Sequence, residues 1–149
     1  MKTLDLYNKL SSYPFGKQLF SYFFCRKLPY FFSIKPLVTE LEVGKAVVQM
    51  KERRAVHNHL RGIHAIALCN LCEAAMAMVT EATIPKNLRF IPVAMTVEYK
   101  RKAKGVIRGI SEVKPEDFKV GKVDVPVNVF DENDVNVMSA IITLDVKEK

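Results

Sequence analysis

A stretch without proline or glycine, running from Ile63 to Thr83, constrains the fold of this chain more than any other. Alanine, leucine and methionine dominate it, and these residues have high helix propensities. We therefore predict a helix of about five to six turns. Because apolar side chains occupy most of its circumference, the helix should be buried on most sides.

A narrow polar stripe interrupts this apolar surface. At 100° per residue, Asn70, Glu73 and Thr80 fall on one side of the helix, and we expect this stripe to need a protein neighbour. Apolar residues and cysteines surround Glu73, so we expect its carboxylate to be buried or half-buried. Desolvation would raise the pKa of such a group toward the range of a general base. A structural glutamate bonded to a cation or a backbone N–H is the alternative.

Composition indicates a single globular domain spanning residues 1–149. The chain is 49% hydrophobic and 26% charged, which is sufficient for one core. The N-terminus lacks the pattern of a secretory signal, and we expect no apolar run that spans a bilayer, so we predict a cytoplasmic protein. Three cysteines, Cys25, Cys69 and Cys72, are an odd number that favours reduced thiols over disulfides.

Strand patterns flank the predicted helix. A hairpin turned near Gly44 precedes it, and alternating apolar residues follow it in several segments. Pro126 interrupts one of these segments, which predicts a bulge or an outward-facing edge there. This order indicates an α+β fold with one long helix packed on an antiparallel sheet. The predicted strand regions are 36–54 (the hairpin), 90–101, 106–113, 120–130 and 135–146.

Residues 1–35 form an aromatic N-terminal arm, in which nine aromatic side chains lie between Tyr13 and Phe32. A short helix is predicted from Lys17 to Lys27, stopped by Pro29. We expect the arm to pack on the sheet or to line an apolar pocket, and contact with a membrane surface is the less favoured alternative.

One helix cannot cover the apolar face of six strands, so the arm or a second copy of the chain must cover the rest of that face. We expect a homodimer, possibly assembled into a tetramer.

The net charge of +7 includes two basic clusters, residues 51–54 and 100–104. No nucleic-acid-binding motif accompanies them, so we expect no nucleic-acid partner. Lys100, Arg101 and Lys102 are candidates to bind the phosphates of coenzyme A, with a solvated rim as the alternative.

Three segments carry a resemblance that covers nearly all of the chain: PYFFSIKP, VHNHLRGIHAIALCNLCEAAMAMVTEA and MTVEYKRKAKG. They resemble the hotdog-fold acyl-CoA thioesterases, and most closely a largely uncharacterised thioesterase-like branch of that superfamily. The resemblance implies a hotdog fold, in which a curved antiparallel sheet wraps a long central helix. It also implies dimers joined edge to edge, with thioester sites at the dimer boundary.

The same resemblance assigns roles to individual residues. Asn58 and His64 match an asparagine and a histidine of the family, and Glu73 takes the place of its catalytic Asp or Glu. Ala65 replaces a common glycine, and its N–H at the helix start could still stabilise a carbonyl oxygen. His64 and Glu73 lie nine residues apart, hence on opposite sides of a helix with a rise of about 13 Å between them. A site that uses both would therefore take them from two subunits, although His64 could also be a simple capping residue.

Two functions follow as hypotheses. The first is hydrolysis of acyl-CoA or another acyl thioester, and the second is non-catalytic binding of an acyl ligand.

We expect no cofactor and no metal. A zinc site of His57, His59, His64, Cys69 and Cys72 is the rival interpretation, but these cysteines lie inside the predicted helix and the spacing matches no standard zinc motif.

Overall fold

The computed structural model describes residues 3–149. The predicted helix, hairpin and later strands are all present, with boundaries shifted by a few residues. The helices are α1 (Thr3–Ser11), α2 (Gly16–Lys27) and α3 (Ala65–Thr83), with short 3-10 helices η1 (Pro29–Ser33), η2 (Arg54–Val56) and η3 (Pro115–Asp117). The strands are β1 (Leu37–Glu42), β2 (Lys45–Lys51), β3 (Leu88–Tyr99), β4 (Val106–Glu112), β5 (Gly121–Phe130) and β6 (Asn136–Glu148).

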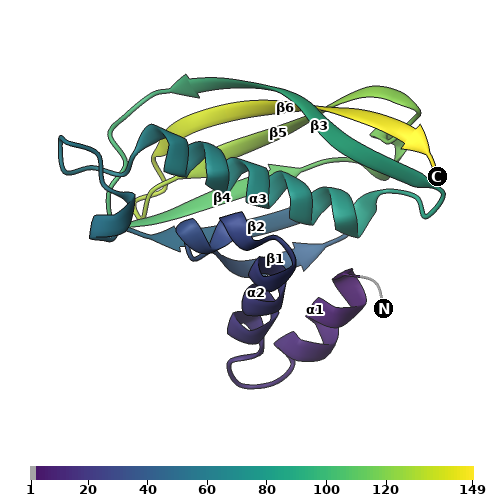
Figure 1. Cartoon of the computed structure of the whole chain (residues 1–149), viewed down its shortest axis with the longest axis horizontal. Helices are drawn as coiled ribbons and strands as arrows, with labels where there is room; N and C mark the ends of the chain where they lie inside the picture. Colours follow the sequence, from purple (N-terminus) through teal and green to yellow (C-terminus); the bar gives the residue numbers. More distant parts are fainter. Residues whose placement is uncertain (1–2) are drawn as a thin grey trace.

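The strands form one antiparallel sheet in the order β1-β2-β4-β5-β6-β3. Helix α3 lies across one face of this curved sheet. Helices α1 and α2 lie below α3 in the view, beside β1 (Figure 1). This arrangement confirms the predicted α+β class with a long central helix and an N-terminal helical arm.

The ends of α3 are set by specific contacts. His64 caps the N-terminus, because its Nδ1 accepts a hydrogen bond from the Ile66 N–H at 3.1 Å. At the other end, Pro85 restricts the residue before it and stops the helix. Thr83 Oγ1 accepts from the Gly44 N–H at 2.8 Å, which fastens this end to the β1–β2 turn.

Small side chains let α3 approach the sheet closely. A Cβ added at Gly109 of β4 would lie 3.3 Å from Leu71 Cγ and 3.5 Å from Ala75 Cβ. Both helix residues are fully buried, so a larger residue at position 109 would push the helix away from the strand. The close packing places the core between α3 and the sheet, with the alternate valines of β5 pointing inward.

The apolar character of α3 is explained by this position. Within residues 3–149, α3 has the length and composition of a membrane-spanning helix, and 56% of its most apolar window is buried inside the domain. The expectation that no such segment exists was therefore wrong by length and composition. A helix enclosed by a sheet needs the same apolar residues as a helix enclosed by lipid.

Pro126 of β5 has no N–H to donate, and at its position no hydrogen bond between β4 and β5 is lost as a result. The hydrogen-bonded ladder between β4 and β5 ends at the pair Ile110 and Asn128, so Pro126 lies beyond it. Its carbonyl accepts from Ser111 Oγ at 2.7 Å. Pro126 therefore lies at a locally unpaired stretch of an interior strand, and neither a bulge nor an outer edge of the sheet occurs there, because the register shift of β5 lies at Val129/Phe130.

The two edges of the sheet differ. The arm covers β1: Tyr7 Oη and Lys17 Nζ donate to the Thr39 carbonyl, and the Val38 N–H donates to Ser21 Oγ at 2.9 Å. In contrast, within residues 3–149 β3 pairs with β6 alone, and its residues 91–94 are all exposed. The open edge for a further strand is therefore β3.

Candidate functional site

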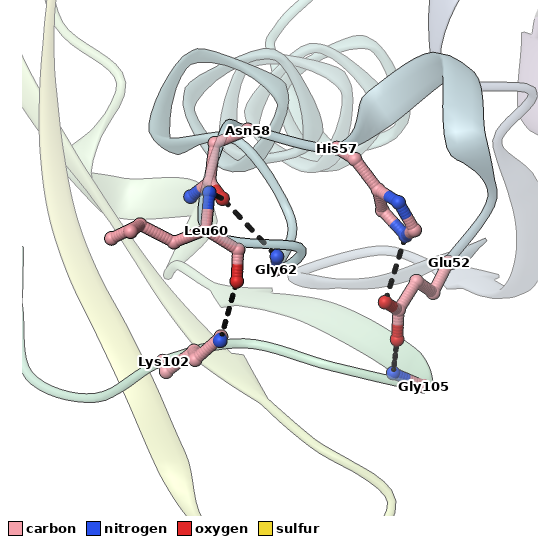
Figure 2. Close-up of polar contacts among 7 residues, drawn as sticks. All are labelled: Glu52, His57, Asn58, Leu60, Gly62, Lys102 and Gly105. Atoms are coloured by element: carbon pink, nitrogen blue, oxygen red, sulfur yellow. Dashed lines mark hydrogen bonds and ion pairs between the residues drawn. The ribbon is translucent and has the colours of Figure 1, made fainter.

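Asn58 organises the loop that leads into α3. Its Oδ1 accepts hydrogen bonds from the Leu60 N–H at 2.9 Å and from the Gly62 N–H at 3.1 Å, and its own N–H donates to the Gly62 carbonyl (Figure 2). This is the side-chain-to-backbone turn that asparagine favours. Asn58 is thus a loop-ordering residue in the single chain, which its match to the family did not reveal.

Contacts to the segment after β3 hold this loop in place. Lys102 Nζ donates to the Leu60 carbonyl at 2.8 Å, and the Ile63 N–H donates to the Ala103 carbonyl at 3.0 Å. In addition, Glu52 Oε2 accepts from the Gly105 N–H at 2.6 Å (Figure 2). These bonds bring residues 51–54 and 100–104 together, so the two basic clusters form one region beside the start of α3.

His57 completes this network, with its Nε2 lying 2.8 Å from Glu52 Oε1 (Figure 2). The Gly105 N–H, and secondarily His57, lower the pKa of the Glu52 carboxyl below its ordinary value. Glu52 is therefore the anionic centre of an otherwise basic region. Sequence reasoning grouped it with its cationic neighbours and missed this role.

The start of α3 presents hydrogen-bond donors. Because His64 Nδ1 accepts from the Ile66 N–H, the neutral ring carries its proton on Nε2 and can donate from there. Ala65 is the first helical residue, and its N–H belongs to the first turn, whose amides have no intrahelical acceptor. The predicted capping role of His64 is present, and it leaves the second ring nitrogen available.

Glu73 lies on the opposite side of α3, facing the arm. Its side chain is exposed in the single chain, so the expectation of a buried or half-buried carboxylate was wrong. Of the residues that flank it, Cys72 and Met76 are buried, whereas Ile66 is 57% exposed.

An apolar cavity of about 390 Å³ begins beside Glu73. It lies between α3 and the arm, and aromatic rings from α2, η1 and β3 line it. Its polar groups are few and include Glu73 and Glu81, both on α3. Such a largely apolar cavity with a small number of polar groups is typical of small-molecule sites. The arm residues of the lining include Phe20, Phe23, Phe24, Leu28 and Phe31.

The polar stripe of α3 is divided between different environments. Asn70 is buried and its Nδ2 donates to Ser33 Oγ of η1 at 2.9 Å, and Thr80 is fully buried. The arm is therefore the protein neighbour of Asn70, and Glu73 is the stripe residue that stays exposed. Asn70 lines a smaller hollow with His64 and a further one with Glu73, so these hollows follow α3 from its start to the cavity.

All three cysteines are free thiols, and Cys25 and Cys72 are buried in the core. Burial raises the pKa of Cys25 to about 11 and that of Cys72 to about 12, which disfavours their thiolates. Cys69 Sγ lies 3.2 Å from Tyr99 Oη, and this hydrogen bond, followed by burial, raises the pKa of Tyr99 to about 12. No group of three His, Cys, Asp or Glu side chains within residues 3–149 could hold a metal ion.

The predicted site residues thus fall in two places. Asn58, His64 and Ala65 lie together at the start of α3, and Glu73 lies at the cavity. Lys102 is engaged with the Asn58 loop, and Lys100 Nζ lies 3.7 Å from Glu98 Oε2 on the exposed surface near Arg101. The cavity agrees with the expectation that the aromatic arm packs on the sheet or lines an apolar pocket, although its position beside Glu73 was not predicted.

Comparisons with known proteins agree with this architecture. The model of a family described as a domain of unknown function, DUF4442, matches residues 16–146. A search of curated proteins found no match. A crystal structure from structural genomics is 36% identical in sequence, with a TM-score of 0.88 and 99% of each chain covered.

More distant structures carry functional descriptions. A Pseudomonas aeruginosa protein of unknown function, described as a probable thioesterase, is 20% identical with a TM-score of 0.76, covering 84% of this chain and 91% of that one. A hypothetical thioesterase from Streptococcus pneumoniae, crystallised with coenzyme A, is 19% identical with a TM-score of 0.66, covering 76% of this chain and 90% of that one. At these identities the likeness shows the fold, and it confirms the expected hotdog architecture.

Proposed function

Since the chain belongs to the DUF4442 family and has a hotdog fold, we propose that it hydrolyses acyl thioesters, with coenzyme A as the carrier. The observation that carries this proposal is the position of Glu73, whose carboxylate stands at the edge of an apolar cavity of about 390 Å³. An acyl chain in the cavity would leave its thioester carbonyl near a carboxylate that can accept a proton.

The proposed reaction uses groups already described. Glu73 takes a proton from water as the water oxygen adds to the thioester carbonyl, and direct attack by the carboxylate is the alternative. The side-chain N–H of Asn58 orients the thioester carbonyl, and the Ala65 N–H and the Nε2–H of His64 stabilise the negative charge on its oxygen. The carbon–sulfur bond then breaks, and the proton returns to the leaving thiolate, giving a carboxylic acid and a thiol.

We assign these groups to two subunits. Glu73 and His64 lie on opposite sides of α3, so a single chain cannot direct both at one carbon. The open edge of β3 supports a dimer, because the other edge is covered by the arm. Pairing at β3 would place the loop of one chain near the cavity of its partner.

The basic region supports coenzyme A as the carrier. Lys100 and Arg101 are exposed beside the loop that holds Asn58, and Lys102 is fixed to that loop. Cations so placed suit the phosphates of a nucleotide-bearing ligand. The coenzyme A present in the Streptococcus pneumoniae structure is consistent with this assignment.

One observation favours the second candidate, a non-catalytic acyl-binding protein. Glu73 is exposed in the single chain, whereas a catalytic carboxylate acts from a site that excludes bulk water. Binding of an acyl chain by the cavity would not require the carboxylate at all.

The Glu73→Gln variant separates the two functions. Glutamine keeps the volume of the side chain but cannot take a proton, so hydrolysis should fall by about a hundredfold or more while acyl-CoA binding persists. The measurement is release of free thiol across a series of acyl-CoA chain lengths. Glu81→Gln is the matched control, since Glu81 is an exposed glutamate on the same helix and lines the same cavity.

Two results would oppose this assignment. Equal activity of wild type and Glu73→Gln would remove Glu73 from the chemistry. If wild type turns over no acyl-CoA but acyl ligands raise its melting temperature, the binding function is the correct one.

A further inference from the structure

The tip of the α1–α2 hairpin exposes aromatic side chains. Tyr13 is 65% exposed and Phe15 is 80% exposed, at the end of a hairpin that projects away from the sheet (Figure 1). Phe15 also has a φ of 59°, a left-handed conformation that is strained for a large residue. Asparagine or glycine would suit this backbone better, so packing within the domain does not explain a phenylalanine here.

The exposed apolar surface continues along α2. Leu19, Tyr22 and Phe23 are spaced as neighbours on one face of the helix and are all about half exposed, while Phe20 and Phe24 on another face are buried. Helix α2 therefore has a second apolar face that the domain does not cover. Contiguous exposed apolar surface of this kind marks an interaction site.

Every charged side chain between Leu6 and Thr39 is positive. Lys17 is engaged with the Thr39 carbonyl, and the other four are exposed. The charged residues of this segment are Lys9, Lys17, Arg26, Lys27 and Lys35.

We propose that this face of the arm docks on the surface of an anionic phospholipid bilayer. Aromatic side chains favour the boundary between headgroups and acyl chains, and basic side chains are attracted to anionic headgroups. A second copy of the chain is a poor occupant, because a symmetric contact would bring two α2 helices together whose charged residues, Lys17, Arg26 and Lys27, are all positive. Phe23 belongs both to this face and to the lining of the cavity, so a docked bilayer lies next to the acyl-binding region.

Vesicle co-sedimentation tests this proposal with the full chain. The probes are vesicles of phosphatidylcholine alone and of phosphatidylcholine with about one quarter phosphatidylserine. Wild type should bind the anionic vesicles about tenfold or more tightly than the neutral ones, and salt should weaken the binding. The Tyr13→Ser, Phe15→Asn double variant should lose about tenfold or more in affinity, because two apolar insertions are removed.

The control is the Val43→Ser, Val120→Asn double variant, which removes exposed apolar side chains from two turns outside the arm and should bind as wild type does. Asparagine suits the left-handed backbone at position 15, so the arm variant should keep the wild-type melting temperature. Equal binding of neutral and anionic vesicles, or undiminished binding by the arm variant, would overturn the proposal. Absence of vesicle binding together with loss of self-association in the arm variant would assign the face to a second copy.

Discussion

At the scale of single residues, Glu52 shows how one carboxylate orders a basic region. It accepts from the Gly105 N–H and lies beside His57, and so joins the end of β2 to the segment before β4. Because folding lowers the pKa of this carboxyl, the charged form stabilises the native state. That stabilisation is present above the ordinary value of 4.5 and is lost as the pH falls through the lower, folded value.

We predict that Glu52→Gln lowers the melting temperature near neutral pH and that the difference from wild type shrinks below pH 4.5. Glutamine retains an acceptor for Gly105 but carries no charge. The measurement is thermal unfolding of both proteins from about pH 7 down to about pH 3. A difference that stays constant over this range would mean that Glu52 acts through packing or neutral hydrogen bonding. Glu116→Gln, an exposed position in η3, serves as control and should follow wild type throughout.

At the scale of elements, the arm and β1 depend on each other. Ser21 of α2 accepts from the buried Val38 N–H at 2.9 Å and donates to the Lys17 carbonyl at 2.7 Å. This bond satisfies an edge amide of β1 that has no strand beyond it. The arm therefore replaces a neighbouring strand at this edge of the sheet.

Ser21→Ala should lower the free energy of unfolding by about 1–3 kcal/mol, because it leaves the Val38 amide buried without an acceptor. Ser12→Ala is the control: its hydroxyl donates to the Lys9 carbonyl at the exposed tip, and its loss should cost less than about 0.5 kcal/mol. Denaturant unfolding of the two variants gives the comparison. Equal stabilities would show that the arm does not depend on this bond.

The opposite edge should behave as an interface. Val93 of β3 is exposed next to other exposed apolar residues, and we predict that Val93→Lys shifts a dimer toward the 16.9 kDa monomer. Sedimentation at micromolar concentration is the measurement. Val43→Lys places the same charge on an exposed valine of the β1–β2 turn and should leave assembly unchanged. A wild type that is monomeric, or a Val93→Lys variant that assembles normally, would contradict pairing at β3.

At the scale of the whole molecule, the proposed site requires two chains. Asn58→Asp keeps the Oδ acceptor for the Leu60 and Gly62 amides but removes the side-chain donor, so its loop should stay ordered while its activity falls. Glu73→Gln removes the proton acceptor, which the other chain supplies to the same site.

Mixing these two inactive variants should restore about a quarter of the wild-type activity, because half of the dimers are mixed and each mixed dimer holds one intact site. Thiol release after verified subunit exchange is the measurement. Each variant mixed with itself is the control and should remain inactive. If exchange occurs and no activity returns, Glu73 and Asn58 do not serve one boundary site.

The sequence by itself determined the two helices at 17–27 and 63–83, the strands and their order, whereas α1 was not predicted. The helix at 63–83 and the strands around Gly44 and after Phe90 followed from periodicity and from breaking residues such as Pro85, which act over a few positions of the chain. The resemblance in residues 56–82 supplied the fold and the candidate residues. These signals are local or shared by relatives, so they can be recognised without coordinates.

Only the tertiary structure decided which side chains are buried and which segments contact one another. The exposure of Glu73 depends on where the arm lies, and the joining of residues 51–54 to residues 100–104 depends on Glu52 and Gly105, which are far apart in the chain. The covered edge at β1 and the open edge at β3 follow from strand order, which periodicity does not encode. Burial and hydrogen-bond partners arise from contacts between distant segments, and for that reason they were decided by packing and not by local pattern.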